Sequence, residues 1–208
     1  MAAGTLALVG GLSVAPTAQA ASPSIDQQIL NTLSTAHSYE VVLDSKGSDA
    51  TSTFHADVIT VRHGNAAQTY AKFTGAALSM QLAMSGNKIC VNVVGPWTCT
   101  PAASSPFGSL LKFTPADLLK PLGGQLKLTP IGSKTIAGHH AAGYSFTAAT
   151  SVGASKGTLW VDPATKRVIE LDTTVNAGIM GQTTTASIKA LVTHWNDPKL
   201  AIPSVPGL

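Results

Sequence analysis

Charged residues are scarce in this 208-residue chain: Asp, Glu, Lys and Arg together make up 11% of it, and the formal net charge is +3. Aromatic residues account for only 5%. The basic residues form no run beyond the Lys166-Arg167 pair, so the chain lacks the basic groove with interleaved aromatics that single-stranded nucleic acid needs. Nucleic acid is therefore not an expected partner.

Residues for catalysis or metal binding also lack the usual spacing. Aspartates stand in turn-like pairs such as Asp162-Pro163 and Asp197-Pro198. His139 and His140 are neighbours, but adjacent residues of a strand point to opposite faces, and a solvated hairpin tip is the simpler interpretation. Four further histidines are scattered, at His37, His55, His63 and His194. We therefore expect no enzyme activity, no metal site and no cofactor.

The first twenty residues have the features of a secretory signal peptide. An uncharged, mostly apolar run from Gly4 to Val14 is too short to span a bilayer, and the small-x-small pattern Ala18-Gln19-Ala20 follows it. No Lys or Arg precedes the run, which is consistent with a start inside a longer leader. An ordinary apolar helix of the fold is the alternative. We expect residues 1–20 to be removed on export, and residues 21–208 to form one domain in a secreted, periplasmic or cell-envelope protein.

Cys90 and Cys99 are the two cysteines of the chain. Their C-x8-C spacing matches neither the C-x2-C pairs of zinc sites nor a redox C-x-x-C motif, and cysteines of exported proteins normally pair. A four-residue loop at Val93 to Pro96 would set Cys90 directly opposite Cys99 in an antiparallel hairpin, close enough for a disulfide. We predict a structural disulfide between them.

Short helices and antiparallel strands account for the remaining pattern. A capping-box pattern at Ser24 to Gln27 predicts a helix to Ala36, and Thr114 to Lys120 predicts a second. No long helix separates successive strands, which argues against βαβ units. The predicted strands are 38–46, 52–62, 66–73, 77–85, 87–93, 125–129, 133–137, 143–150, 157–162, 167–175 and 182–195.

The predicted strand from Ala77 to Ser85 shows the strictest alternation of large apolar residues with small or polar ones. Long, flexible apolar residues at Leu78, Met80, Leu82 and Met84 alternate with small or polar ones, so they share one face. Methionine adapts to an irregular partner. This row therefore suits the wall of a cavity for an acyl chain, with plain core packing as the alternative.

The order of the elements and several local phrases resemble the LolA-like superfamily of periplasmic lipoprotein carriers and its relatives, the mycobacterial-type lipid-transfer lipoproteins. The likeness extends over roughly Ser22 to Leu208. It is carried by the opening helix followed by SYEVVLD, by the hairpin SGNKICVNVVGPWTC, and by the segments KTIAGHHAAGYSFT, GTLWVDPATKRVIELD and VTHWNDPKLAIPSVP.

The resemblance implies an α+β, mostly β fold: an unclosed β-barrel of curved antiparallel sheet covered by short helices, with an apolar cavity between sheet and helices. The helix from Ser24 and the segment from Leu110 to Leu122 would cover the open side. The sequence does not fix which face of the sheet lines this cavity. The residues expected to line it are Leu78, Met80, Leu82, Met84, Ile29, Leu33, Leu118 and Leu119.

The implied function is binding and carriage of a lipid or lipidated cargo, loaded or received through a membrane-associated protein, by a monomer. The alternative is an extracytoplasmic sensor or regulatory interaction module with no transported ligand. The chain departs from the family in two respects. It has no lipobox cysteine, so a lipid anchor is not expected, and no residue clearly matches the arginine that locks the lid of the carriers, although Arg62 and Arg167 are candidates by residue type.

Overall fold

The computed structural model describes residues 24–47, 53–63, 66–75, 79–105, 127–150, 153–179 and 182–208. One helix is followed by strands and a single 3-10 turn within these ranges. In chain order the elements are α1 (Ile25–Thr35), β1 (Ser38–Gly47), β2 (Thr53–His63), β3 (Ala66–Gly75), β4 (Ser79–Ser85), β5 (Lys88–Asn92), β6 (Thr98–Pro101), η1 (Ala102–Ser104), β7 (Thr129–Ile136), β8 (His139–Thr150), β9 (Gly153–Val161), β10 (Val168–Ile179) and β11 (Gln182–Thr193).

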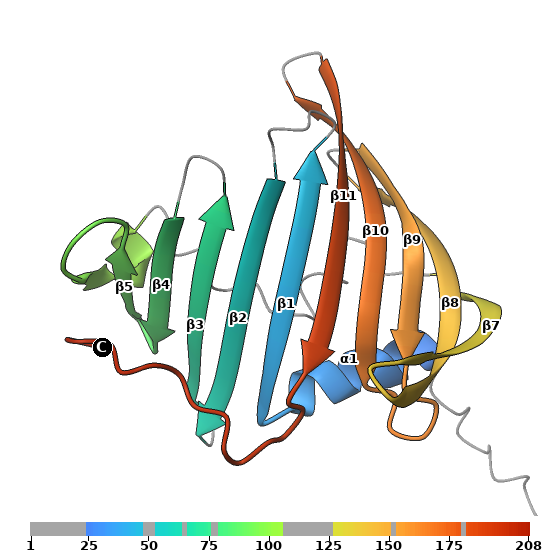
Figure 1. Cartoon of the computed structure of the whole chain (residues 1–208), viewed down its shortest axis with the longest axis horizontal. Helices are drawn as coiled ribbons and strands as arrows, with labels where there is room; N and C mark the ends of the chain where they lie inside the picture. The colour runs from blue at the N-terminus through green and yellow to red at the C-terminus, as the bar shows by residue number, and fades with distance from the viewer. Residues whose placement is uncertain are drawn as a thin grey trace, which may run out of the picture.

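The strands form one curved antiparallel sheet, in the order β6-β5-β4-β3-β2-β1-β11-β10-β9-β8-β7 (Figure 1). Each half of the chain folds as a meander, and β1 joins the two halves by pairing with β11, from Glu40↔Thr193 to Gly47↔Ala186. Strands β6 and β7 stand at opposite ends of this order, so the sheet does not close into a barrel. The predicted unclosed, mostly β architecture is confirmed.

Helix α1 lies across one face of the sheet, near the start of β1 (Figure 1). Ile29 and Leu33 recur every four residues along the helix, which places them on one side, and they are 1% and 2% exposed. They pack with Tyr39 and Val41 of β1 and with residues of β8 to β11. Ser24 is the N-cap but makes no side-chain capping hydrogen bond, so the predicted capping box does not form. Burial of the apolar side is what stabilises this short helix.

Residues paired directly across neighbouring strands project from the same face of a sheet. Val41, in the core against α1, pairs with Val58, Val58 with Ala71, and Ala71 with Leu82. The face that α1 covers therefore extends without interruption from β1 to β4. We call it the helix face.

The strand predictions are close, but they omit β6 and divide β7. In place of the predicted strands 125–129 and 133–137, the described residues form one strand, β7, which begins at Thr129 and crosses a register shift between Pro130 and Gly132. Gly132 has φ = 113°, which lets the backbone continue through the irregular pair as one strand. His139 and His140 are exposed, but they begin β8; the turn itself is Ala137-Gly138. The predicted helix at 114–120 lies outside the described residues.

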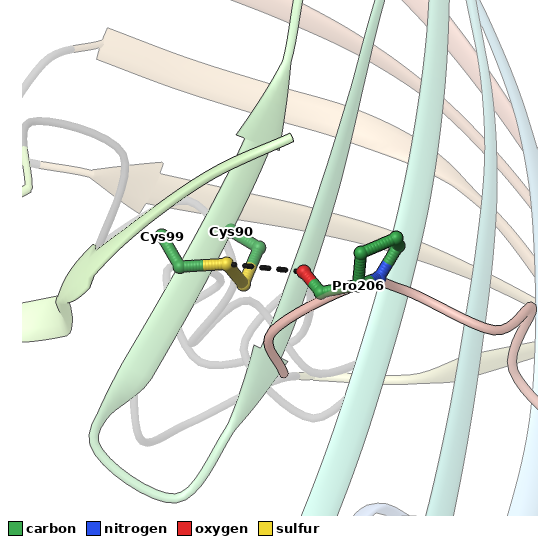
Figure 2. The surroundings of a disulfide bond; sticks show 3 residues. All are labelled: Cys90, Cys99 and Pro206. Carbon is green, nitrogen blue, oxygen red and sulfur yellow. Dashed lines mark hydrogen bonds between the residues drawn. A yellow bond between two sulfur atoms is a disulfide. The ribbon is translucent and has the colours of Figure 1, made fainter. Parts of the chain in front are cut away.

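The predicted disulfide is present, and Cys90 pairs with Cys99 in the predicted register at a Cα separation of 4.0 Å. The carbonyl oxygen of Pro206 lies 3.5 Å from the Sγ atom of Cys99 (Figure 2). A bonded sulfur carries no hydrogen, so this is a sulfur-oxygen contact. It brings the C-terminal segment back over the sheet near β5 after leaving β11 (Figure 1). Among the described residues, no helix is long and apolar enough to cross a membrane.

Candidate functional site

A cavity of about 1010 Å³ opens at the ends of the central strands that lie away from α1. Its large apolar side chains are Phe54, Phe146 and Ile188. Phe146 also packs in the core with Ile29 of α1, which places the cavity on the helix face. Charged residues also border the cavity, but they alternate along the strands with its apolar residues and project from the opposite face of the sheet: Asp44, Lys46, His55, Lys156, Asp172 and Lys189.

One row of paired residues forms the floor of the cavity across six strands, from β2 to β8. Its members are Phe54, Ser45, Ile188, Thr173, Gly157 and Phe146. Aromatic rings stand at both ends of the row, and short side chains occupy most of its middle. Because the side chains in the middle of the row are mostly short, they leave a space that larger apolar side chains would fill. The residues that set this pattern lie far apart in the sequence.

Gly157 is the position where the close approach of the backbone matters most. A Cβ atom built there would lie 2.1 Å from the carbonyl oxygen of Asp172 and 3.0 Å from the ring of Phe146. Both distances are shorter than van der Waals contact, and the first involves backbone that cannot swing away. Glycine at position 157 is therefore required both for the close pairing of β9 with β10 and for the shape of the cavity floor.

Apolar surface continues from the cavity towards β4. The rings of Phe54 and Phe73 are stacked with centroids 5.6 Å apart, and Phe73 pairs with Met80. Met80 and Leu82 belong to a second buried cluster, against which Phe73 and Met84 are partly buried. The cavity wall and this cluster form a continuous apolar stretch of the helix face.

The residues proposed from the sequence as cavity residues fall into three groups. Met80, Leu82 and Met84 lie on the helix face, but Met80 and Leu82 are 8% and 0% exposed within the cluster. Ile29 and Leu33 are buried in the core beneath α1. None of these five borders the 1010 Å³ cavity. Leu78, Leu118 and Leu119 lie outside the described residues.

The residues that do border the cavity gave no signal in the sequence. Nine of them are serine or threonine, a composition typical of any exposed strand. What distinguishes them is their place in one row, which depends on the register of β1 with β11 and of β10 with β9.

Charges gather on the opposite face of the sheet. Glu170 is buried and accepts a hydrogen bond from Lys134 at 2.7 Å, and Lys189 lies 3.1 Å from its other carboxylate oxygen. Lys134 also lies 4.1 Å from the centroid of the Trp160 ring. Burial alone would raise the pKa of Glu170, but the two lysines outweigh it and lower that pKa. The pairing therefore keeps a buried carboxylate ionised.

His55 forms a smaller cluster on the same face. Its Nδ1 atom lies 2.7 Å from Asp44 and its Nε2 atom 3.2 Å from Asp57. The hydrogen bond with Asp44 is the main reason that the pKa of His55 is raised. Both carboxylates favour the charged ring, so the protonated form is stabilised in the folded protein.

The two arginines considered from the sequence occupy different places. The Nη1 atom of Arg62, at the end of β2, donates a hydrogen bond to the carbonyl oxygen of Ser34 in the last turn of α1. A guanidinium at this end of a helix satisfies a carbonyl that lacks an intrahelical partner. Arg167 stands instead in the turn before β10. Of the two, Arg62 is the one that ties the helix to the sheet.

Two features of the described residues bear on metal binding and on catalysis. These residues contain no group of three or more His, Cys, Asp or Glu side chains placed to hold a metal ion. Residues 153–157 read G-A-S-K-G, which has the G-x-S-x-G spacing of the nucleophile motif of α/β-hydrolases. That nucleophile requires a sharp strand-to-helix turn, whereas Ser155 lies inside β9 and its buried Oγ atom has no hydrogen-bond partner among the described residues.

No known protein family and no curated protein matches the sequence. Among solved structures, the lipoprotein LppX from Mycobacterium tuberculosis aligns with a TM-score of 0.56 and 16% identity, covering 86% of this chain and 96% of LppX. The MucA/MucB complex from Pseudomonas aeruginosa gives 0.47 and 13%, covering 87% and 59%. A LolA superfamily protein from Nitrosomonas europaea gives 0.32 and 12%, covering 85% and 94%.

At these identities the likeness shows the fold alone. The alignment with LppX nevertheless covers most of this chain and nearly all of LppX. It agrees with the fold that the resemblance in the sequence implied. The protein shares the fold of LppX, and in this chain that fold is an unclosed antiparallel sheet with α1 packed on one face.

Proposed function

We propose that this protein is an exported carrier that binds a lipid or another hydrophobic ligand in the cavity of the helix face. The observation that carries the proposal is the cavity itself, about 1010 Å³ in volume, with apolar walls at Phe54, Phe146 and Ile188. Its apolar surface continues through Phe73 to Met80. This volume lies at the upper end of the range for ligand pockets, about 300–1,000 Å³.

Apolar burial supplies enough free energy for such a ligand without any charged contact. Each methylene removed from water contributes about 0.8 kcal/mol, so an acyl chain that buries ten methylenes gains roughly 8 kcal/mol before the costs of ordering. The hydroxyl groups along the floor, such as those of Ser45 and Thr173, can meet the ester or hydroxyl groups of a lipid. Binding of this kind needs no catalytic residue and no metal.

Export is the second part of the proposal. It is supported by the Cys90–Cys99 disulfide, which is typical of oxidising compartments, and by the signal-like pattern of residues 1–20. We place the mature protein, residues 21–208, outside the cytoplasm as a single domain. The residues that we infer to touch the ligand are the apolar walls of the cavity, with the row from Met80 to Met84 as their extension.

The test is mass spectrometry of organic extracts from protein purified without detergent from an exporting host. Ile188→Asp places a carboxylate inside the cavity, and Ser133→Asp places the same charge at an exposed position on β7 that does not border the cavity. We expect a stoichiometric lipid with the native protein and with Ser133→Asp, and its loss with Ile188→Asp. Retention of the same lipid by a folded Ile188→Asp variant would refute the assignment of this cavity.

An empty extract from native protein is also informative, provided that reloading with native membrane lipids fails. It would favour the alternative function, an extracytoplasmic interaction module that presents a surface to a partner protein. The buried cluster of Ala71, Met80, Leu82 and Ile89 supports that alternative, because part of the helix face is already filled by packed side chains.

A further inference from the structure

A second, smaller pocket of about 270 Å³ lies at the other end of the sheet, next to α1. Three connections meet there: the turn Ala137-Gly138 between β7 and β8, residues 162–167 between β9 and β10, and the segment that follows β11. Thr32 of α1 also reaches this region, with its hydroxyl 3.5 Å from the carbonyl oxygen of Thr165. The pocket shares no lining residue with the lipid cavity proposed above.

The base of this pocket is apolar and held in place. It consists of Ile169, Leu191, Val192 and Trp195. The Nε1 atom of Trp195 donates a hydrogen bond to the carbonyl oxygen of Val168 at 2.9 Å, and its ring lies 5.8 Å from that of Tyr39 in the core. A ligand therefore meets a surface that is already ordered, which lowers the entropic cost of binding.

The rim carries hydrogen-bond donors with unused capacity. Arg167, His139 and His194 line the pocket. Glu40 lies 2.8 Å from the Nδ1 atom of His194 and orients that ring. Among the described residues, Arg167 and His139 have no side-chain hydrogen bond and no ion pair within 4.0 Å.

The acidic group of the pocket, Asp162, is stabilised mainly by its own turn: hydrogen bonds from Thr165 and Ala164 lower its pKa most, and the charge of Arg167 contributes least. The Oδ1 atom of Asp162 accepts hydrogen bonds from the backbone N–H groups of Ala164 and Thr165, both at 2.8 Å, so it serves its own turn. Glu40 is similarly engaged by His194 and Thr193. The guanidinium of Arg167 therefore remains the strongest available partner for an anion.

Residues with a strained backbone conformation lie in or next to the lining of the same pocket. Among the described residues, four that are not glycine have a left-handed backbone: Ala137, Lys166, His194 and Asn196, with φ between 48° and 60°. Ala137 and His194 line the pocket, and Lys166 and Asn196 each directly adjoin lining residues. Residues other than glycine adopt this conformation at a cost in free energy, and strained backbone tends to cluster where a binding surface must be held in a set geometry.

We propose that this pocket binds a small organic carboxylate, with the carboxylate on Arg167 beside His139 and the apolar body on Ile169, Leu191 and Trp195. A bidentate contact with the guanidinium would fix the orientation of the anion. The apolar base would select a branched or aromatic body over a bare inorganic anion. This site is distinct from the lipid cavity and does not depend on the function proposed for it.

Isothermal titration calorimetry with benzoate tests the proposal, with ring signals of His139 and His194 followed by NMR. Benzoate should bind saturably and shift both signals, whereas benzyl alcohol, which has the same ring without the charge, should bind at least about tenfold more weakly. Arg167→Met should weaken benzoate binding at least about tenfold. Lys72→Met removes the same charge from an exposed position on β3, away from the pocket, and should leave binding unchanged.

Three outcomes would overturn the proposal. The first is the absence of saturable benzoate binding, and the second is an Arg167→Met variant that binds as well as the native protein. The third is inorganic phosphate binding as tightly as benzoate, because it would show that the apolar base contributes nothing. Lipid content in extracts of Arg167→Met should match that of the native protein, which separates this site from the cavity on the helix face.

Discussion

Glu170→Gln removes one charge from the buried centre of the Lys134–Glu170–Lys189 cluster while keeping the shape of the side chain. Glu170 is 4% exposed, and its two oxygens lie 2.7 Å and 3.1 Å from the lysine nitrogens. Each hydrogen bond with a charged partner contributes about 1.5–3 kcal/mol. The lysine side chains are 40% and 56% exposed, so they regain water when the carboxylate is lost.

The expected loss is therefore about 1–3 kcal/mol in the free energy of unfolding, below the roughly 3–5 kcal/mol for a fully buried pair. Urea denaturation at pH 7 measures it. The folded-state pKa of Glu170 is lowered from the ordinary value of 4.5, so its contribution is complete above that value and disappears as pH falls through the folded-state pKa. The difference between native and variant protein should accordingly be constant from pH 6 to 8 and close under more acidic conditions.

Two results would refute this reasoning. One is an unchanged denaturation midpoint at pH 7, which would show that the cluster contributes nothing. The other is a difference that persists undiminished well below pH 4, which would trace the loss to packing around the amide. Glu40→Gln is the matched control, because Glu40 is more exposed and its ion pair is with a histidine; its loss should stay below about 1 kcal/mol.

Three further predictions concern stability. Replacing both cysteines by serine should lower the free energy of unfolding by about 2–3 kcal/mol, since the disulfide closes a short loop; identical midpoints for the oxidised and serine proteins would contradict this. Gly157→Ala should cost at least about 1–3 kcal/mol, because the new methyl group overlaps the Asp172 carbonyl oxygen, and calorimetric melting measures it. In His55→Gln the pH dependence of stability should change. The raised pKa of His55 stabilises the native protein below about pH 6.5, and this contribution, held under about 1 kcal/mol by solvent exposure, is lost as pH rises through the folded-state value. Parallel stability profiles from pH 5 to 8 would argue against a role for the Asp44 contact.

Local sequence was sufficient wherever neighbouring residues decide the structure. The alternation from Met80 to Met84 identified a strand and its apolar face, and the four-residue loop after Asn92 placed Cys90 opposite Cys99. Ile29 and Leu33 marked the buried side of α1. These features depend on contacts within one strand, one hairpin or one helix, so a period or a loop length specifies them.

The sequence was less informative at irregular positions. The register shift near Gly132 merged two predicted strands into β7, because a bulge lets a strand continue past residues that look like a turn. Ser24 and Gln27 had the spacing of a capping box, yet Ser24 makes no side-chain cap. Spacing alone records which groups are near one another along the chain and leaves open whether their side chains adopt the required rotamers.

By itself, the sequence determined an antiparallel β protein with a disulfide-closed hairpin, an amphipathic first helix and very little charge. Only the tertiary structure decided where the empty space lies. The floor of the cavity joins Phe54 to Phe146 through one residue from each intervening strand, and the second pocket joins turns that end near residues 138, 166 and 196. The cavity arises from the pairing of β1 with β11, which brings the two halves of the chain together, and the second pocket arises where connections between strands of the second half meet. No local pattern encodes either arrangement.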